Sequence, residues 1–388
     1  MKIYRVAMLG CRSRGTSAAQ GYNAHPRTEV VGLCDLVQER VNTLGDELGV
    51  SARYDDLDKM IEETSPDIVV IPTGTEFHYP LLMRVLEHGV NVDVEKPICT
   101  DLVQADEVVA KAQEKGVRIA VHHQGRVGAS MKAVWTAYQE GRIGELRYIQ
   151  GSGKGYYAGY GLMNIGTHIL NNFFKFAGHC RSVSAVGLTD GHPITPRDVV
   201  PSPSGMGTIA CEQVTAALSF DNNVTADLLQ HRFPVVDSAA YMLELYGTEG
   251  RLIWKSGSAW VLPQPHFLPD GERDRWEPLD LIYHEDFDPK GSAGETEFWF
   301  ADDYVQALDE GRSHECSGDE ALHVIEVLMG IFESAAYQKA VELPQDQRDH
   351  PLLRWRREHG LEEPESMPRG YGDWLKAEDE RLGRATGG

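Results

Sequence analysis

Short apolar runs alternate with amphipathic stretches of helical period through the first 124 residues. This alternation is typical of βαβ units, in which helices cover a parallel sheet. The predicted strands cover residues 3–9, 29–34, 67–73, 90–94 and 117–122, and the predicted helices cover 16–24, 37–48, 79–88 and 101–115. Thr100 is expected to cap the last helix. The pattern predicts a dinucleotide-binding, Rossmann-type domain over residues 1–124.

The rhythm changes after residue 125, where strand patterns joined by short turns follow one another. Such an order favours an antiparallel sheet. The predicted strands cover residues 146–151, 183–188, 214–220, 224–229, 241–246 and 252–255, and the predicted helices cover 130–140, 162–176, 296–310 and 319–339. Residues 189–208, rich in Pro, Gly and Ser, are expected to form a long loop. We predict an α+β domain over residues 125–344 with a large, mainly antiparallel open sheet, and an α/β fold class for the whole chain.

The last segment, residues 345–388, is charged and punctuated by proline, but it also carries Trp355, Tyr371 and Trp374. Burying large aromatic side chains lowers the free energy of the folded protein. We therefore expect this C-terminal extension to dock on the body of the protein or on a neighbouring subunit.

The composition excludes several classes of partner. The formal net charge of -22 repels a phosphate backbone and an anionic membrane surface, so we expect no nucleic acid and no membrane partner. No uncharged stretch approaches the ~20 residues needed to span a bilayer, and the start of the chain lacks the features of a signal peptide. The six cysteines form no Cys-x-x-Cys pair, which favours reduced, buried thiols. A cytoplasmic location is expected.

A glycine-containing loop follows the first predicted strand and opens the first predicted helix. Gly10 permits a tight turn there, and Gly15 lets the helix pack closely. The free amides at the helix start, with Ser13, Arg12 and Arg14 nearby, suit a pyrophosphate. Arg12 stands where the Gly-x-Gly-x-x-Gly fingerprint has its middle glycine.

Asp35 ends the second predicted strand, 20 residues after Gly15. A carboxylate at this position can accept hydrogen bonds from the hydroxyls of an adenosine ribose. The same charge repels the additional phosphate of NADP, although Arg12, Arg14 or Arg40 could partly compensate. NAD is the predicted cofactor.

The run Glu95-Lys96-Pro97, at the end of the fourth predicted strand, is similar to a motif of the Gfo/Idh/MocA oxidoreductases, the family of glucose-fructose oxidoreductase and inositol dehydrogenase. Residues 71–78 resemble the family's Thr-Pro-Asn-x-x-His segment, with Gly74 and Thr75 in place of its proline and asparagine. Residues 141–145, 246–250 and 341–344 extend the match, which covers residues 3–344. The resemblance implies that Thr73, His78, Glu95 and Lys96 line the cofactor site.

Residues 161–168 resemble the family's second catalytic motif, in which an Asp precedes a His by four residues. Here Asn164 takes the place of the Asp before His168. On a helix these two side chains share a face, and Asn171 and Asn172 continue it. The resemblance implies that His168 removes the hydroxyl proton of a substrate while Lys96 orients that hydroxyl. It implies hydride transfer between NAD and a sugar, glycoside or cyclitol.

The resemblance points to further candidate site residues. Gln124 and Arg126 come after the fifth predicted strand, where family members place residues facing the nicotinamide and the substrate. Tyr160, with Tyr156 and Tyr157, precedes the catalytic helix and could line a sugar pocket. Asn172 is a further candidate for the substrate. The pair His122-His123 lies on a strand, where neighbours face opposite sides, so we predict no metal site.

Two alternatives stay open. Some relatives of this family keep NAD bound and use a transient oxidation to hydrolyse or eliminate a glycosidic bond, and Asn164 raises that possibility. A sensor that binds the cofactor without catalysis is disfavoured because Lys96 and His168 are both present. The resemblance also implies a homodimer or homotetramer that associates through the open sheet.

Overall fold

A six-stranded parallel sheet forms the N-terminal part of the computed structural model, which describes residues 1–265 and 269–384. The strands lie in the order β3-β2-β1-β4-β5-β6. The central strands are almost wholly buried because helices cover both faces of such a sheet, which is why they are so apolar. The strands are β1 (Tyr4–Leu9), β2 (Thr28–Cys34), β3 (Arg53–Tyr54), β4 (Ile68–Ile71), β5 (Asn91–Val94) and β6 (Ile119–Val121).

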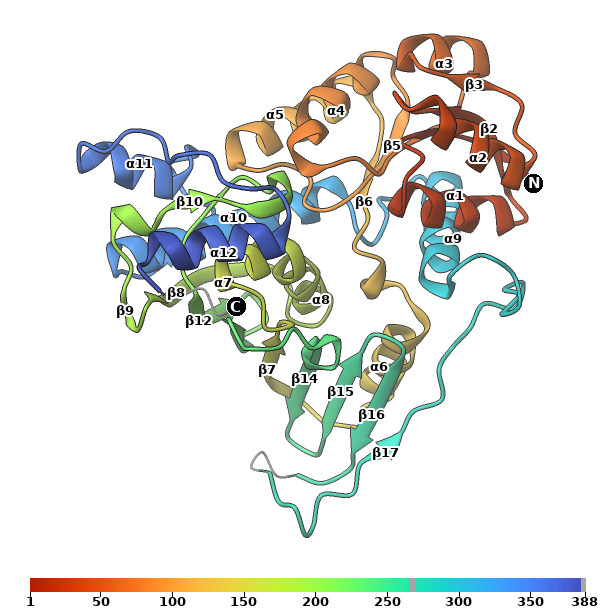
Figure 1. The fold of residues 1–388 in the computed structure, drawn as a ribbon. Helices are drawn as coiled ribbons and strands as arrows, with labels where there is room; N and C mark the ends of the chain where they lie inside the picture. The colour runs from red at the N-terminus through yellow and green to blue at the C-terminus, as the bar shows by residue number, and fades with distance from the viewer. Residues whose placement is uncertain (266–268, 385–388) are drawn as a thin grey trace. The chain divides into compact units, whose positions relative to one another are not determined.

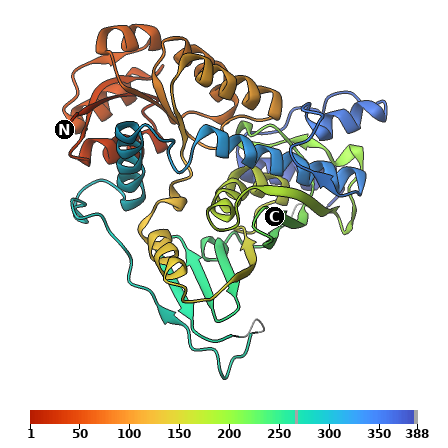
Figure 2. The same ribbon diagram turned by 180° about the vertical axis from the view of Figure 1, so that it is seen from behind.

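The helices that connect these strands are α1 (Arg14–Ala24), α2 (Gln38–Leu48), α3 (Leu57–Thr64), α4 (His78–Glu87) and α5 (Leu102–Lys115). A later helix, α9 (Glu295–Glu310), packs beside α1 in both views (Figure 1 and Figure 2). The approach is close: a Cβ added to Gly21 of α1 would lie 2.7 Å from Cβ of Glu297. Residues 282–322 therefore belong to the same compact unit as residues 1–99 and 104–129.

Two elements of this unit were not predicted from the sequence pattern, namely β3 and α3. β3 has only two residues, too few to show a period. α3 is a clear amphipathic helix, which buries Leu57, Met60 and Ile61 and is capped by the Asp56 carboxylate that accepts from the Lys59 amide. The parallel order confirms the predicted Rossmann-type architecture, in which the strand order reverses between the neighbouring parallel strands β1 and β4.

The second unit comprises residues 100–103, 130–281 and 323 onward. Its sheet runs in the order β17-β16-β15-β14-β7-β13-β12-β8-β18, with β9 pairing β8 at one end. Every neighbouring pair is antiparallel except β13 and β7, so the predicted large, mainly antiparallel sheet is confirmed. The domain division predicted at residues 124 and 344 stays a prediction. The long strands are β7 (Leu146–Ser152), β8 (Cys180–Thr189), β12 (Gln213–Phe220), β13 (Thr225–His231), β14 (Met242–Gly247), β15 (Arg251–Lys255) and β16 (Ser258–Leu262).

Shorter elements complete this unit. The segment expected to be a long loop, residues 189–208, contains two-residue strands and two 3₁₀ turns. The turn predicted between β12 and β13 is present, with Asn223 in the left-handed region at φ 60°. The short strands are β9 (His192–Pro193), β10 (Val200–Pro201), β11 (Thr208–Ile209), β17 (Glu277–Pro278) and β18 (Val341–Glu342), and the helices are α6 (Ala129–Gln139), α10 (Gly318–Tyr337), α11 (Pro351–Glu358) and α12 (Tyr371–Arg381).

A continuous helical segment crosses one face of the second sheet. It consists of α7 (Ala158–Gly161), a π-helical turn η3 (Leu162–Gly166) and α8 (Thr167–Ala177), where one long α-helix over residues 162–176 was predicted. Glycine lets its start approach the backbone that follows β11, since a Cβ on Gly159 would lie 2.3 Å from the carbonyl oxygen of Ala210. A single π-turn inside an α-helix is a frequent mark of a functional segment.

The C-terminal extension docks on the second unit through α12, as its aromatic residues predicted. Trp374 is fully buried and donates from Nε1 to the carbonyl oxygen of Pro201, 2.7 Å away. Trp355 is also buried. Across residues 1–265 and 269–384, no helix is both long enough and apolar enough to cross a bilayer.

Candidate active site

The loop after β1 has the backbone that the sequence led us to expect. Gly10 adopts φ +127°, which side chains disfavour, and its amide donates to the carbonyl oxygen of Cys34. A Cβ on Gly15 would lie 2.1 Å from the carbonyl oxygen of Gly10, so only glycine fits there. Arg12 and Ser13 are exposed at the start of α1. The helix start is therefore open to an anionic ligand.

Asp35 ties this loop to the end of β2. Its two carboxylate oxygens accept from the amides of Cys11 and Val37, both at 2.9 Å, and the Arg40 guanidinium lies 3.5 Å away. A carboxylate has about four acceptor positions, so these bonds leave capacity for a ribose hydroxyl. Asp35 thus both shapes the loop and presents an acceptor beside it.

His78 connects the loops that follow β4 and β5. Its side chain is fully buried, with Nδ1 2.8 Å from the Pro97 carbonyl oxygen and Nε2 3.1 Å from that of Thr73. Burial lowers the pKa of His78 in spite of these two carbonyl groups. The Thr73 hydroxyl oxygen is buried without a hydrogen-bond partner among the described residues. His78 therefore holds two loops in place, and Thr73 can still bond a ligand.

Glu95 is the centre of a charged cluster at the carboxyl end of β5. The Arg14 Nε donates to one oxygen of Glu95 at 2.7 Å, and Arg14 Nη1 donates to Glu297 at 3.2 Å. Burial alone would raise the pKa of Glu95, but the charges of His122, Arg14 and Lys96 outweigh it and lower the pKa to about 2. Glu95 is therefore ionised at neutral pH, and Arg14 is held by two carboxylates.

Lys96 follows Glu95 directly, and its amide donates to the other Glu95 oxygen at 3.1 Å. The side chain is half-buried. Burial and then the charge of Lys96 lower the pKa of the neighbouring His123 to about 3, so this imidazole is neutral at pH 7. The cation at Lys96 thus lies in a partly desolvated setting, where its field on a bound group is stronger than in water.

His122 and His123 follow β6, which ends at Val121, so they do not lie on a strand as predicted, although their surroundings differ. Nδ1 of His122 lies 3.2 Å from the fully buried Asp93, whose other oxygen accepts from the Tyr22 hydroxyl at 3.0 Å. Burial opposes the charged form of His122, but Asp93 outweighs it and raises the pKa. Within the described ranges, no group of three or more His, Cys, Asp or Glu side chains could hold a metal ion.

Gln124 and Arg126 lie in a 3₁₀ turn, η2 (Gln124–Arg126), after β6. Arg126 is buried and donates from Nη1 to Glu320 at 3.0 Å, with Glu315 at 3.9 Å. The Gln124 side-chain oxygen is buried without a hydrogen-bond partner in the part of the chain that the structure describes. Arg126 is therefore committed to carboxylates of its own unit, whereas Gln124 can still accept a bond.

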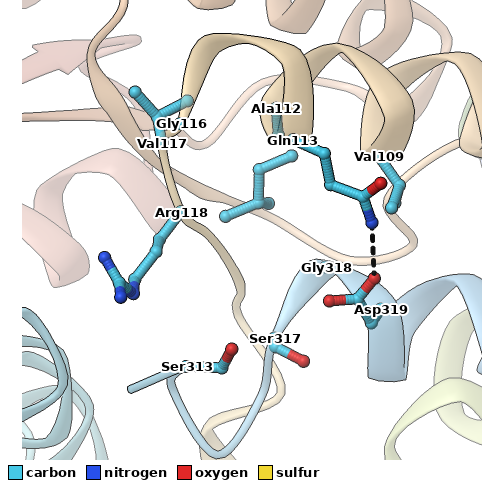
Figure 3. A pocket seen from close by; sticks show the side chains of 11 residues that line it. Val109, Ala112, Gln113, Gly116, Val117, Arg118, Ser313, Ser317, Gly318 and Asp319 are labelled. Atoms are coloured by element: carbon cyan, nitrogen blue, oxygen red, sulfur yellow. Dashed lines mark hydrogen bonds between the residues drawn. The ribbon is translucent and has the colours of Figure 1, made fainter. Parts of the chain in front are cut away.

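Two cavities open in the first unit. One, of about 320 Å³, lies at the carboxyl edge of the sheet between the Gly10 loop and α2, and it is lined by Cys11, Arg12, Ser13, Thr16, Glu39, Arg40, Thr43, Leu44 and Glu47. The other, of about 270 Å³, lies between α5 and the start of α10 (Figure 3). Arg118 and Asp319 line it, near the amino end of β6. Ligands of open parallel sheets bind at the carboxyl edge, so the first cavity suits a dinucleotide.

In the second unit, Asn164 lies in the π-turn and His168 in the first turn of α8. The Asn164 amide donates from Nδ2 to the Tyr160 hydroxyl at 3.0 Å. His168 is 8% exposed, and its ring centroid lies 6.2 Å from that of the buried Tyr241. The continuous helical segment thus carries three of the predicted residues, Tyr160, Asn164 and His168, on successive turns.

Asn172 lies one turn beyond His168 on α8. Its side chain is 1% exposed, and neither its Oδ1 nor its Nδ2 has a hydrogen-bond partner among the described residues. Leaving a buried amide unsatisfied costs free energy, so native proteins seldom do so without a reason. A hydroxyl-bearing ligand would supply the missing bonds.

Two residues of these surroundings were not among the predicted site residues. Glu297 follows a stretch with little pattern, and nothing in the sequence links it to Arg14. Tyr371 was predicted only as an anchor, yet its ring stacks on Tyr160 with centroids 5.0 Å apart. Both contacts join segments that are distant in the sequence, which a local pattern does not reveal.

Comparison with known families matches residues 4–123 to the model "Oxidoreductase family, NAD-binding Rossmann fold" of the Gfo/Idh/MocA proteins. Among curated proteins, D-apiose dehydrogenase of Paraburkholderia graminis is 28% identical over 144 residues, which are 37% of this chain and 38% of that protein. A glycosyl hydrolase family 109 protein of Bacteroides fragilis is 30% identical over 106 residues, 25% of this chain and 23% of that protein. The chain thus spans less than two thirds of the length of these relatives.

Among solved structures, levoglucosan dehydrogenase in complex with NADH and levoglucosan superposes with a TM-score of 0.72 and 18% identity, covering 89% of this chain and 100% of that one. At this identity the likeness shows the fold. These findings confirm the family resemblance drawn from the Glu95-Lys96-Pro97 motif and the expectation of an NAD-binding domain. Residues 4–123 belong to the Gfo/Idh/MocA oxidoreductase family as its NAD-binding Rossmann fold.

Proposed function

We propose that this chain is an NAD-dependent oxidoreductase that transfers hydride between the nicotinamide and a ring hydroxyl of a sugar, glycoside or cyclitol. The observation that carries the proposal is Lys96, a half-buried cation that lies two residues after the last residue of β5, at the carboxyl edge of an NAD-binding sheet. Family membership supports the cofactor, and the sugar dehydrogenases among the relatives support the substrate class.

The residues that would hold NAD belong to the first unit. The amides at the start of α1, with Arg12 and Ser13 beside them, suit the pyrophosphate, and Asp35 suits the adenosine ribose. Thr73 and Gln124 have buried oxygens that lack partners among the described residues, as expected of groups that bond a ligand. When bound, NAD accepts or returns the hydride.

The residues of this chain handle the proton and the charge. Lys96 would orient the reacting hydroxyl and stabilise the negative charge that develops on its oxygen. His168 would take the hydroxyl proton as hydride leaves the same carbon, and Asn164 would orient His168. Tyr160, Asn172 and Arg126 complete the predicted substrate set, although Arg126 would have to exchange its carboxylate partners for substrate.

A second function is favoured by one specific observation. Asn164 stands where the family's second catalytic motif has an Asp, and an amide cannot neutralise a protonated imidazole. In a redox-neutral cycle the hydride taken from the sugar would return to it after the aglycone has left by elimination, with water added to the resulting double bond in a hydrolase. Such a cycle would release no net proton from the hydroxyl to solvent. One relative of this chain is a glycosyl hydrolase family 109 protein, which supports an NAD-dependent glycoside hydrolase or lyase as the second candidate function.

The two functions are separated by incubating the purified protein with NAD and a panel of sugars, cyclitols and aryl glycosides. NADH formed in proportion to the sugar oxidised supports the dehydrogenase, and aglycone released without net NADH supports the redox-neutral enzyme. Lys96→Met should abolish either activity, a loss far larger than any change in NAD affinity. If neither product forms with any compound, the proposed function is wrong.

We further propose a cytoplasmic homodimer or homotetramer. The second sheet has one open face, where alternate residues of β12 are exposed and Val186 of β8 is 61% exposed. Val186 lies opposite Thr215 of β12, and Ala217 is also exposed, so this face presents small and apolar side chains that a second subunit could cover. Sedimentation equilibrium of the purified protein tests this, and a monomer at micromolar concentration would exclude it.

A further inference from the structure

The last helix of the chain, α12, packs against the start of the helical segment that carries Asn164 and His168. The two lie next to each other in the second unit, with α12 in dark blue beside α7 (Figure 1). The side chain that makes the most direct contact is Tyr371, the first residue of α12. The C-terminal extension therefore reaches the residues proposed for catalysis.

Three tyrosine rings form an aromatic cluster at this contact. The rings of Tyr160 and Tyr371 are stacked, with centroids 5.0 Å apart and planes inclined by 23°. The ring of Tyr156 meets both edge-on, at 5.2 Å and 82° from Tyr160 and at 5.0 Å and 90° from Tyr371. Offset stacking and edge-to-face packing are the preferred arrangements of aromatic rings. Tyr371 thus packs against one face of the Tyr160 ring.

The cluster is connected to Asn164 by a hydrogen bond. The Tyr160 hydroxyl accepts from Nδ2 of Asn164 at 3.0 Å, and Tyr160 is only 7% exposed. The Tyr371 hydroxyl in turn accepts from the backbone amide of Tyr157, the residue before α7, at 2.8 Å. One tyrosine of the extension therefore touches both the backbone at the start of the catalytic segment and the ring that holds the Asn164 amide.

Other residues fasten α12 independently of Tyr371. The Tyr157 hydroxyl donates to Glu378 at 3.1 Å, and Trp374 packs edge-on against the Tyr157 ring. Arg232 of the segment after β13 makes a two-pronged bond to Asp379, at 2.7 and 2.8 Å. Such paired charge-assisted bonds are strong. Replacing Tyr371 alone should leave α12 docked.

We propose that Tyr371 is a positioning residue for the reaction, which acts through Tyr160 to fix the orientation of the Asn164 amide. This inference rests on the proposed function in that it assigns Asn164 to the catalytic set. It also makes the C-terminal extension, which lies beyond the residues of the family resemblance, part of the substrate site. The extension then contributes to the reaction as well as to the packing of the second unit.

The variants that test it are Tyr371→Ala, which removes ring and hydroxyl, and Tyr371→Phe, which keeps the stacked ring. We expect Tyr371→Ala to lower kcat about tenfold or more with NAD affinity unchanged, and Tyr371→Phe to stay within about threefold of the parent protein. The matched control is Trp355→Ala, which removes a buried ring of the same extension that packs on Tyr337 and His359. It should lower Tm at least as much as Tyr371→Ala while leaving kcat within about twofold.

A double-mutant cycle distinguishes a positioning role of Tyr371 from a nonspecific loss of structure around it. In an Asn164→Ala background, Tyr371→Ala should have no further effect on kcat, because the group that it positions is already gone. An equal loss of kcat in both backgrounds, an unchanged kcat in Tyr371→Ala, or an equal loss of kcat in Trp355→Ala would each overturn the proposal.

A readout that does not depend on the reaction keeps this test apart from that of the proposed function. In uniformly ¹⁵N-labelled protein, the side-chain amide signals of Asn164 are identified by their loss in Asn164→Asp. Tyr371→Ala should shift these signals and speed their exchange with solvent, and Tyr371→Phe should not. If the Asn164 signals stay unchanged in Tyr371→Ala, the positioning role is wrong whichever reaction the chain catalyses.

Discussion

The charge of Glu95 should stabilise the first unit, and replacing it with Gln should reveal this as a pH-dependent loss. The side chain is 11% exposed and bonds Arg14 through one oxygen and the Lys96 amide through the other. Glutamine keeps the shape of the side chain but cannot carry the charge. Arg14 keeps its second partner, Glu297, so the variant should fold.

The size of the effect follows from the pKa of Glu95. Burial opposes ionisation, but His122, Arg14 and Lys96 lower the pKa from 4.5 to about 2. A fall of this size corresponds to about 3 kcal/mol of folding free energy. Because the folded-state pKa lies below the unfolded-state value, the contribution is complete above pH 4.5 and is lost as the pH falls towards 2.

Amide hydrogen exchange of the buried strands β1, β4 and β5 measures this, since it reports the opening of the first unit by itself. We expect Glu95→Gln to cost about 2 to 3 kcal/mol at pH 7, less at pH 3.5, and less again at any lower pH at which the unit stays folded. Glu62→Gln, at an exposed position of α3, should change the free energy by under about 0.5 kcal/mol. A cost for Glu95→Gln that is below about 0.5 kcal/mol, or that does not decline from pH 7 to pH 3.5, would show that the Glu95 charge does not stabilise the first unit.

Three further substitutions test other parts of the account. Gly159→Ala should lower the free energy of unfolding in urea by about 1 to 3 kcal/mol, because its added Cβ would lie too close to the carbonyl oxygen of Ala210. Gly166→Ala should be neutral or stabilising, because its added Cβ would lie 3.5 Å from Leu162, an ordinary contact distance. Similar costs for the two variants would contradict the packing around Gly159. Asn164→Asp should move the pH profile of turnover about one unit towards higher pH by raising the pKa of His168, and an unchanged profile would count against contact between them. Asp35→Ser should raise the Kd of NAD about tenfold or more by calorimetry, and an unaltered Kd would exclude the ribose contact.

Much of the fold could be predicted from the sequence because periodicity is a local signal. The strands and helices of the first sheet follow from apolar runs and amphipathic stretches, and Gly10 and Asp35 follow from the backbone and charge that a dinucleotide loop needs. The resemblance of the Glu95-Lys96-Pro97 run to a known motif added the family, which the comparison then confirmed. Short or atypical elements, such as β3 and the π-turn around Asn164, carry no period of their own.

The rest depends on contacts between distant segments. Arg14 is predicted to face a phosphate, but Glu95 and Glu297 hold its guanidinium, and the second of these comes from a helix 283 residues further along the chain. Arg126 likewise pairs with Glu320. Tyr371 reaches Tyr160 only because α12 folds back on the second unit. Partners of this kind are set by tertiary packing, so a pattern within one segment cannot reveal them.

In the proposed function, this chain moves hydride from a sugar carbon to NAD with the help of Lys96. The most direct measurement is mass spectrometry of the nicotinamide after incubation with sugars and cyclitols deuterated at their carbinol carbons. We expect one deuterium per NADH formed, and a loss of activity in Lys96→Met of about a hundredfold or more, which exceeds any change in NAD affinity. Absence of deuterated nicotinamide with every compound would exclude the proposed hydride transfer, and its undiminished formation in Lys96→Met would exclude the role of Lys96.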